Sequence, residues 1–342
     1  MRALAREFDL GGITIFRRLA NIEDPEQVAG LAFDIRNLGV EMPGWVGIDQ
    51  EGGRVARLKS PFTEWPPMAT LGRSDDIALT RKFAAALAAE MAAVGITLDY
   101  APVLDIHTNP KNPVIGDRAL GEKPEVVSKL GRVIIEELQR AGVAACGKHF
   151  PGHGDTATDS HAELPIVEHP PDRLRAVEFA PFRMAIEARV AFLMTAHVLV
   201  TTIDDELPAT LSKKIVQKIL REELGFNGVI VSDDLEMKAI ADNYSAGDAA
   251  VAAISAGCDA ILMCGSGSMV DIGLQVQALE ALIRAIEDQR LPVKQVEAAL
   301  ERNRRAKEGF LREWRPPTAA QLRQMIGLEE YRAISERMSQ FA

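Results

Sequence analysis

Three histidines lie close together in one polar segment of the chain. Lys148 and His149 begin the run Lys-His-Phe-Pro-Gly-His-Gly-Asp-Thr, and Asp159-Ser-His161 follows two residues later. An imidazole has a pKa of about 6.5 and exchanges protons near neutral pH, so the segment carries the groups needed for general acid and base chemistry. Histidine and aspartate also bind metals, but neither a His-Glu-x-x-His pattern nor a cysteine pair supports a zinc site. Proton transfer is the favoured chemistry, with a metal site as the alternative.

Two adjacent carboxylates, Asp233 and Asp234, end an apolar stretch in the run Val-Ser-Asp-Asp-Leu. Side chains alternate along a strand, so one of the two would point into an active site while the other orients or caps the next segment. From the residues alone, either carboxylate can be a nucleophile. Both could instead cap a helix or pair with arginines.

A third polar run extends from Asp49 to Arg57 and reads Asp-Gln-Glu-Gly-Gly-Arg-Val-Ala-Arg. Its carboxylate, amide and guanidinium groups suit the paired hydrogen bonds of neighbouring sugar hydroxyls, and its acidic residues argue against a phosphate-binding loop. Arg118 follows the next apolar stretch, which ends at Asp105 and His107. Taken alone, Arg118 would be a surface ion-pair residue.

The elements that position these runs are apolar, β-branched stretches alternating with amphipathic ones, a pattern typical of βα units. Seven strands are predicted, at 13–16, 45–49, 96–106, 143–150, 191–197, 228–234 and in the run Ala-Ile-Leu-Met-Cys that begins at Ala260. Helices are predicted at 76–94, 124–141, 172–188, 212–224, 246–256 and 269–289. Four of these helices should end at glycines that enter the left-handed conformation: Gly95, Gly142, Gly225 and Gly257.

Polar residues at the carboxyl ends of several strands are typical of a (β/α)8 barrel, whereas a doubly wound sheet gathers them near one switch point. Seven strands are one short of a closed barrel, and the roughly ten residues before the first are too few for another βα unit. We therefore expect an α/β barrel that lacks its first strand or is atypical there, either of which leaves room for an upstream strand or signal peptide. Residues 1–342 should form a single domain, with 291–342 as a helical tail packed on the barrel.

The composition indicates which partners to expect. A net charge of -10 argues against nucleic acid and anionic membranes, and favours a small polar ligand. The three cysteines are odd in number and show no metal-ligand spacing, which predicts reduced thiols in a cytoplasmic protein. No apolar run approaches the ~20 residues that span a bilayer. We expect a cytoplasmic monomer.

The three motifs, in this order, resemble family 3 glycoside hydrolases, and more narrowly their single-domain bacterial β-N-acetylglucosaminidases of peptidoglycan recycling. The resemblance covers about residues 11–265, from Gly11 to Gly265. It implies a barrel fold, no cofactor, and retaining hydrolysis of terminal β-linked N-acetylhexosamine through a covalent glycosyl-enzyme intermediate. The substrates implied are peptidoglycan fragments or chitooligosaccharides.

The resemblance also implies a role for each matching residue. Asp233 is expected to be the nucleophile, His161 the acid and base, and Asp159 the partner that orients His161. His153 is expected to shape the loop. The substrate-binding positions are Asp49, Arg57, Arg118, Lys148 and His149.

Four alternatives stay open at this point. A β-glucosidase or β-xylosidase would typically lack the Asp-Ser-His loop, and a phosphorolytic enzyme would use the neutral histidine to tolerate phosphate. A catalytically impaired sugar-binding protein would bind without turnover. A metal-dependent hydrolase would lose activity in chelator.

Overall fold

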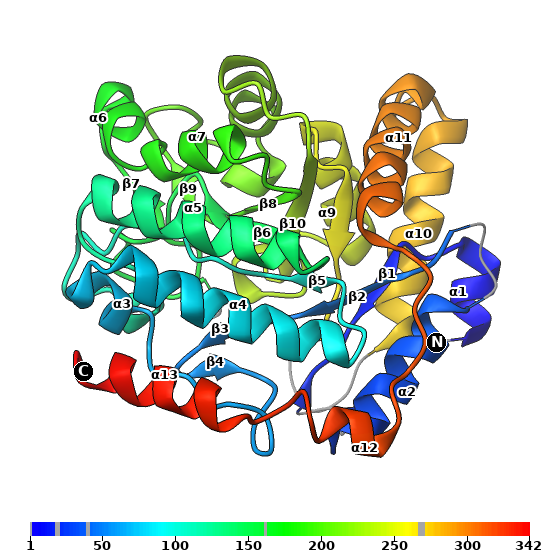
Figure 1. Ribbon diagram of the computed structural model, residues 1–342. Helices are drawn as coiled ribbons and strands as arrows, with labels where there is room; N and C mark the ends of the chain where they lie inside the picture. Colours follow the sequence, from blue (N-terminus) through cyan, green and yellow to red (C-terminus); the bar gives the residue numbers. More distant parts are fainter. Residues whose placement is uncertain (1, 18–20, 39–41, 161–162, 266–270) are drawn as a thin grey trace. The chain divides into compact units, whose positions relative to one another are not determined.

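The computed structural model describes residues 2–17, 21–38, 42–160, 163–265 and 271–342 (Figure 1). The chain divides into two compact units, the first made of residues 1–104, 117–147 and 307–342, and the second of residues 105–116 and 148–306. Seven parallel strands follow one another in the order β1-β2-β5-β6-β8-β10-β11. The predicted α/β class with seven strands is confirmed.

The strands of the first unit are β1 (Gly12–Thr14), β2 (Trp45–Ile48), β5 (Leu98–Asp99) and the start of β6 (Ala144–Phe150). They pair in register, with Ile13 beside Val46 and Leu98 beside both Gly47 and Ala144. Every residue of β2 and β6 is buried, which explains the apolar runs of β2 and of the first part of β6. Lys148 and His149 are buried near the end of β6. A short antiparallel hairpin of β3 (Gln50–Gly52) and β4 (Val55–Ala56) follows β2.

Helices α4 (Ile77–Ala93) and α5 (Pro124–Arg140) pack against each other in the first unit. The Asp76 carboxylate accepts hydrogen bonds from the N–H groups of Ala78 and Leu79 and so begins α4. The C-terminal helix α13 (Glu329–Ser339) lies along α4, as the red and cyan ribbons show (Figure 1). The remaining helices of this unit are α1 (Arg2–Phe8), α2 (Pro25–Arg36), α3 (Ala69–Ser74) and α12 (Ala319–Leu322).

The second unit contains β8 (Phe192–Thr195), β10 (Val229–Asp234) and β11 (Ala260–Leu262), with the last residues of β6. A separate parallel pair is formed by β7 (Ile166–Val167) and β9 (Leu199–Val200). Phe150, at the end of β6, packs against the rings of Phe179 and Phe182 at 5.4 and 5.2 Å between centroids. The helices and helical turns of the second unit are α6 (Pro171–Ala176), α7 (Ala180–Glu187), η3 (Ala209–Leu211), the π-helix η4 (Lys214–Glu223), α8 (Lys238–Ala241), α9 (Ala246–Ala256), α10 (Ile272–Glu287) and most of α11 (Val293–Phe310).

Three predicted elements differ from those observed. The strand predicted at 96–106 is a strand only at Leu98–Asp99, and Pro102, which has no N–H to donate, follows closely. The helix predicted at 172–188 is two helices, and Pro181 lies in the first turn of the second. The helical tail predicted at 291–342 consists of three helices, α11, α12 and α13.

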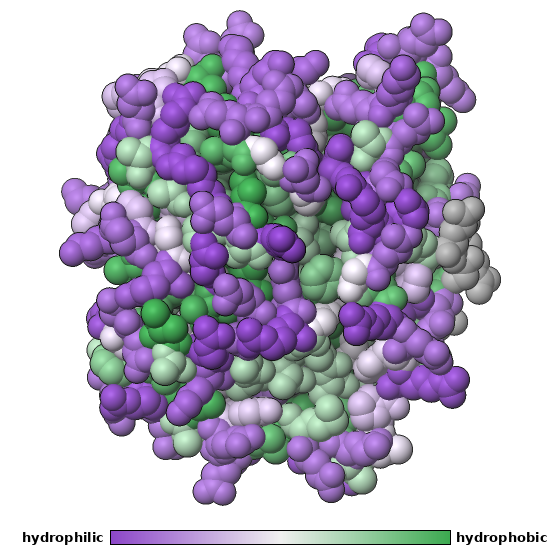
Figure 2. Space-filling view, turned by 45° about the horizontal axis from the view of Figure 1, so that its top comes forward, coloured by the Kyte–Doolittle hydropathy of each residue, from purple (hydrophilic) through white to green (hydrophobic). Residues whose placement is uncertain are grey.

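The helix predicted at 269–289 begins at Ile272 in the structure, and the residues from 266 to 270 lie outside the described part of the chain. None of the helices in the described ranges is both long and apolar enough to cross a membrane. Figure 2 shows hydrophilic residues spread over the face in view, with smaller hydrophobic areas between them.

Candidate active site

Asp49 and Arg57 are brought together in the first unit by the hairpin that follows β2. Asp49 comes directly after β2 and Arg57 directly after β4, and Arg57 Nη2 lies 3.0 Å from Asp49 Oδ2. The Gln50 amide oxygen accepts hydrogen bonds from the N–H groups of Arg57 and Leu58 at 2.8 and 2.9 Å. The buried Gln50 therefore fixes the backbone that presents Arg57.

Arg118 ends the short helix η2 (Gly116–Arg118) and is held by Glu51. Its Nε and Nη2 donate to the two Glu51 carboxylate oxygens at 2.9 and 2.7 Å. The Glu51 side chain is only 1% exposed and that of Arg118 is 11% exposed, so this is an almost fully buried two-point ion pair. Our prediction included Arg118 and omitted Glu51, although Glu51 stands in the same run as Asp49 and Arg57.

In the second unit, a buried carboxylate orients His149 at the end of β6. Asp105 Oδ2 lies 2.6 Å from His149 Nδ1 and accepts the His149 N–H at 3.2 Å. Burial by itself raises the pKa of Asp105, but the His149 and His153 imidazoles and the hydrogen bonds that they donate outweigh burial, and the pKa is lowered. An ionised Asp105 holds the Nδ1–H tautomer of His149 and leaves Nε2 for other contacts.

His153 is buried in the loop that follows β6. Its Nδ1 lies 2.7 Å from Thr156 Oγ1 and its Nε2 lies 3.0 Å from Ser160 Oγ. Burial and the neighbouring His149 lower the pKa of His153 to about 4, so the ring is neutral near pH 7 and bridges two hydroxyls. These contacts agree with the expected loop-shaping role, because Ser160 directly precedes His161.

Gly154 makes the closest backbone approach in this loop. A Cβ atom at this position would lie 1.9 Å from the carbonyl oxygen of Ile106. Only glycine fits against that oxygen. The loop after β6 therefore rests directly on the segment that follows Asp105.

Asp233 and Asp234, the last two residues of β10, have different surroundings. Burial by itself raises the pKa of Asp233, but His197, His149, the Asp234 N–H and Lys148 outweigh burial and lower it. The Asp234 N–H donates to Asp233 Oδ1 at 2.8 Å. Asp233 is therefore an ionised carboxylate surrounded by cationic and donor groups, as a nucleophile requires.

Asp234 instead holds the chain that follows. Its Oδ1 accepts the N–H groups of Glu236 and Cys264, each at 3.1 Å. Burial raises the pKa of Asp234 to about 6, and the charge of Asp233 contributes to this rise. The two neighbouring carboxylates thus have different hydrogen-bond partners and opposite pKa shifts.

His197 follows β8 and was not among the predicted site residues. Its Nε2 lies 2.9 Å from the carbonyl oxygen of Asp234, and its Nδ1 lies 2.8 Å from Thr210 Oγ1. Like Asp105 and Glu51, it ends or follows a buried strand, and that position was the available signal in the sequence.

The structure brings the predicted site residues together in two groups. Asp49, Arg57 and Arg118 belong to the first unit. The second unit contains Lys148, His149, Asp159 and Asp233. The Asp159 side chain is partly buried, and its carbonyl accepts the Glu163 N–H at 3.0 Å, whereas His161 lies outside the described residues.

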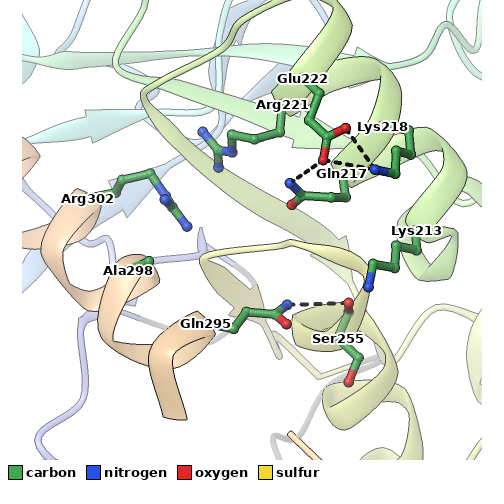
Figure 3. Close-up of a pocket in the computed structure, with 9 residues that line it drawn as sticks. All are labelled: Lys213, Gln217, Lys218, Arg221, Glu222, Ser255, Gln295, Ala298 and Arg302. Atoms are coloured by element: carbon green, nitrogen blue, oxygen red, sulfur yellow. Dashed lines mark hydrogen bonds and ion pairs between the residues drawn. The ribbon is translucent and has the colours of Figure 1, made fainter. Parts of the chain in front are cut away.

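A polar cavity of about 410 Å³ lies elsewhere in the second unit, between η4, α9 and α11 (Figure 3). Arg221 and Arg302 project into it, and both bind Asp259, which directly precedes β11. The cavity is thus at the amino end of the strands, whereas barrel enzymes carry their chemistry at the carboxyl ends. We do not assign it to catalysis. Its lining is Lys213, Gln217, Lys218, Arg221, Glu222, Ser255, Gln295, Ala298 and Arg302.

Within the described ranges, no group of three or more His, Cys, Asp or Glu side chains is arranged to hold a metal ion. Cys146 and Cys258 are buried and Cys264 is partly exposed, and all three are free thiols.

Parallel strands with carboxylates and imidazoles at their carboxyl ends define an enzyme of the barrel class, and comparison with known proteins identifies its family. Residues 1–306 match the family described as "Glycosyl hydrolase family 3 N terminal domain". The chain belongs to glycoside hydrolase family 3, and the predicted enzyme class is confirmed.

Individual relatives and solved structures show which members of the family this chain resembles. The chain is 39% identical over 270 residues to a β-hexosaminidase of Thiobacillus denitrificans, covering 77% of this chain and 73% of that protein. It is also similar to a family 3 β-N-acetylglucosaminidase from Paenibacillus sp. str. FPU-7, with a TM-score of 0.93 and 39% identity over 99% of this chain and 64% of that one. NagZ from Neisseria gonorrhoeae matches with a TM-score of 0.78 and 30% identity over 97% of this chain and 91% of that one. The chain thus spans less than two thirds of the Paenibacillus protein.

Proposed function

We propose that this chain is a retaining β-N-acetylhexosaminidase that removes terminal β-linked N-acetylglucosamine from a glycan. The observation that carries the proposal is Asp233, a carboxylate kept ionised beside Lys148, His149 and His197 at the end of β10. The proposal also rests on the β-hexosaminidase names of the relatives.

The proposed reaction has two displacements. In the first, Asp233 Oδ2 attacks the anomeric carbon, because Oδ1 already accepts the Asp234 N–H. The glycosidic C–O bond breaks as His161 donates its proton to the leaving oxygen, which leaves a covalent glycosyl-enzyme. In the second, His161 takes a proton from water, and the resulting hydroxide displaces Asp233 and releases the sugar. Asp159 would orient His161 and stabilise its protonated form.

The remaining predicted residues would bind the sugar. Lys148 and His149 belong to the same unit as Asp233 and contribute to its electrostatic surroundings, so we assign them to hydroxyl groups close to the reacting carbon. Arg118, held in one orientation by Glu51, would donate in a fixed direction. Asp49 and Arg57 would act as an acceptor and donor pair.

The biological setting stays a prediction. We propose cytoplasmic action by a monomer on small fragments of peptidoglycan or chitin, without nucleic-acid or membrane partners. The support is the net charge of -10 and the three free thiols.

The first test is hydrolysis of 4-nitrophenyl β-N-acetylglucosaminide, with the corresponding glucoside as the comparison substrate. We expect selective cleavage of the N-acetylglucosaminide that persists in chelator and is lost in Asp233→Ala. Equal cleavage of the glucoside would favour a β-glucosidase, and activity removed by chelator would favour a metal enzyme. A sugar phosphate among the products in phosphate buffer would favour phosphorolysis. Sugar binding without turnover by the folded chain would overturn the proposal.

A further inference from the structure

Asp155 and His169 flank the stretch 156–168, which contains Asp159 and His161. His169 Nε2 hydrogen-bonds to Asp155 Oδ2, while Thr108 Oγ1 donates to Asp155 Oδ1 at 2.7 Å. One carboxylate thus joins the two ends of this stretch to each other and to residue 108, within the second unit.

His169 is itself fixed on its other side. Its carbonyl oxygen accepts the Thr202 hydroxyl at 2.6 Å, and the strand β7 just before it pairs with β9. Arg173 Nη1 lies 3.4 Å from His169 Nδ1 and 3.5 Å from Nε2. Because an ionised carboxylate only accepts, Nε2 is the nitrogen that donates to Asp155.

Arg173 is held in turn by Glu178, whose Oε1 lies 3.0 Å from Arg173 Nη2. The Glu178 side chain is only 8% exposed, so the series from Glu178 through Arg173 and His169 to Asp155 has a buried end. The Asp155 and His169 side chains are 26% and 27% exposed, and ion pairs this exposed contribute little to stability. The contact between Asp155 and His169 therefore matters for the position of the stretch that it joins rather than for the stability of the fold.

We propose that His169 is a positioning residue that, by binding Asp155, closes the base of the stretch carrying the acid and base pair, Asp159 and His161. This inference rests on the proposed function for its kinetic consequence. Its structural part, the closure of the base by His169, stands independently of any substrate.

The kinetic test compares His169→Ala with His169→Gln, whose amide N–H can replace the imidazole donor to Asp155. In His169→Ala, kcat/KM for chitobiose, which reports the first displacement, should fall by ~10 to 100-fold, because a misplaced acid protonates a poor leaving group slowly. The kcat/KM of the 2,4-dinitrophenyl glycoside, whose leaving group needs no protonation, should change by less than about 3-fold. His169→Gln should recover most of the loss on chitobiose. Equal losses on both substrates would overturn the positioning role.

A second measurement does not depend on activity. Hydrogen exchange followed by mass spectrometry should show faster exchange in peptides covering 156–168 for His169→Ala than for the unmodified chain or His169→Gln. Glu168→Ala is the matched control, because Glu168 is exposed and directly precedes His169. Unchanged exchange in His169→Ala would overturn the proposal. Faster exchange in a chain that cleaves no N-acetylglucosaminide would support the closure while contradicting the proposed function.

Discussion

The two groups of predicted site residues carry different kinds of charge. In the first unit, Arg57 and Arg118 are paired with Asp49 and Glu51, and an arginine keeps its proton throughout the accessible pH range. In the second unit, imidazoles stand beside carboxylates, and both can change protonation. Permanent charges in a fixed geometry suit recognition, whereas titratable groups suit proton transfer and covalent chemistry. Under the proposed function, the first unit would contribute substrate-binding residues alone, whereas the second would contribute both substrate binding, through Lys148 and His149, and the reacting groups.

The largest contrast is expected between Asp233 in the second unit and Asp49 in the first. Asp233→Asn should lower kcat by at least about 10³-fold, because an amide cannot form the glycosyl-enzyme. Asp49→Asn should mainly raise KM. Burst kinetics and steady-state assays of both variants would check this. A larger loss of kcat in Asp49→Asn would reverse the assignment of roles.

The next effect concerns the acid. His161→Ala should lower kcat/KM, which reports the first displacement, by about 10² to 10³-fold on chitobiose and much less on an activated aryl glycoside. Azide should restore turnover of the aryl substrate by replacing water in the second displacement. Equal losses on both substrates, without azide rescue, would move the acid role to another residue.

A smaller effect is expected from Arg118→Lys in the first unit. The substitution keeps the charge but loses the two-point pair with Glu51, so kcat/KM should fall by roughly 10 to 30-fold. The matched variant is Arg54→Lys, because the Arg54 and Asp117 side chains are about half exposed and their pair should be weak. Similar losses in both variants would show that the buried geometry of Arg118 is unimportant.

The smallest expected effect is on stability and concerns Asp234. Its pKa of about 6 in the folded chain lies above the roughly 3.9 of an unfolded aspartate, so the folded state binds the extra proton. Stability from this group is therefore present below about pH 4 and is lost as pH rises through 6. Asp234→Asn should be more stable than the unmodified chain at pH 7, by on the order of 1 to 2 kcal/mol, and equally stable at pH 4.

Urea unfolding at the two pH values would measure this difference. Asparagine keeps the oxygen that accepts the Glu236 and Cys264 N–H groups, so the comparison isolates the charge. A variant less stable at pH 7 would show that the Asp234 charge supports the fold.

The strands were predictable because β2 and the first part of β6 are buried and leave apolar runs, which Lys148 and His149 follow within β6. The polar residues at the ends of these strands could be recognised because they stand directly after apolar runs. The division of the helix at 172–188 could have been read from Pro181, which is favoured in a first helical turn. The single-domain organisation stays a prediction.

The site residues were harder to predict where they depend on distant contacts. Asp105 lies 44 positions from His149, and His197 lies 37 positions from Asp234, so no local sequence pattern predicts either contact. Glu51 was not among the predicted site residues, and its partner Arg118 lies 67 positions away, so no local pattern shows that it holds Arg118. The roles of Asp233, Asp159 and His161 stay predictions until the variants are measured.

The first unit is made of residues from both ends of the chain, and this determines which unit the ribosome completes first. The second unit uses residues 105–116 and 148–306, whereas the first also requires 307–342, including α13 against α4. Domains generally fold during synthesis once all their parts have emerged. The unit that contains the earliest residues is therefore finished after the second, and until then the side of α4 that contacts α13 stays open to chaperones and proteases. A nascent chain arrested near residue 306 should be cleaved first within the residues synthesised earliest.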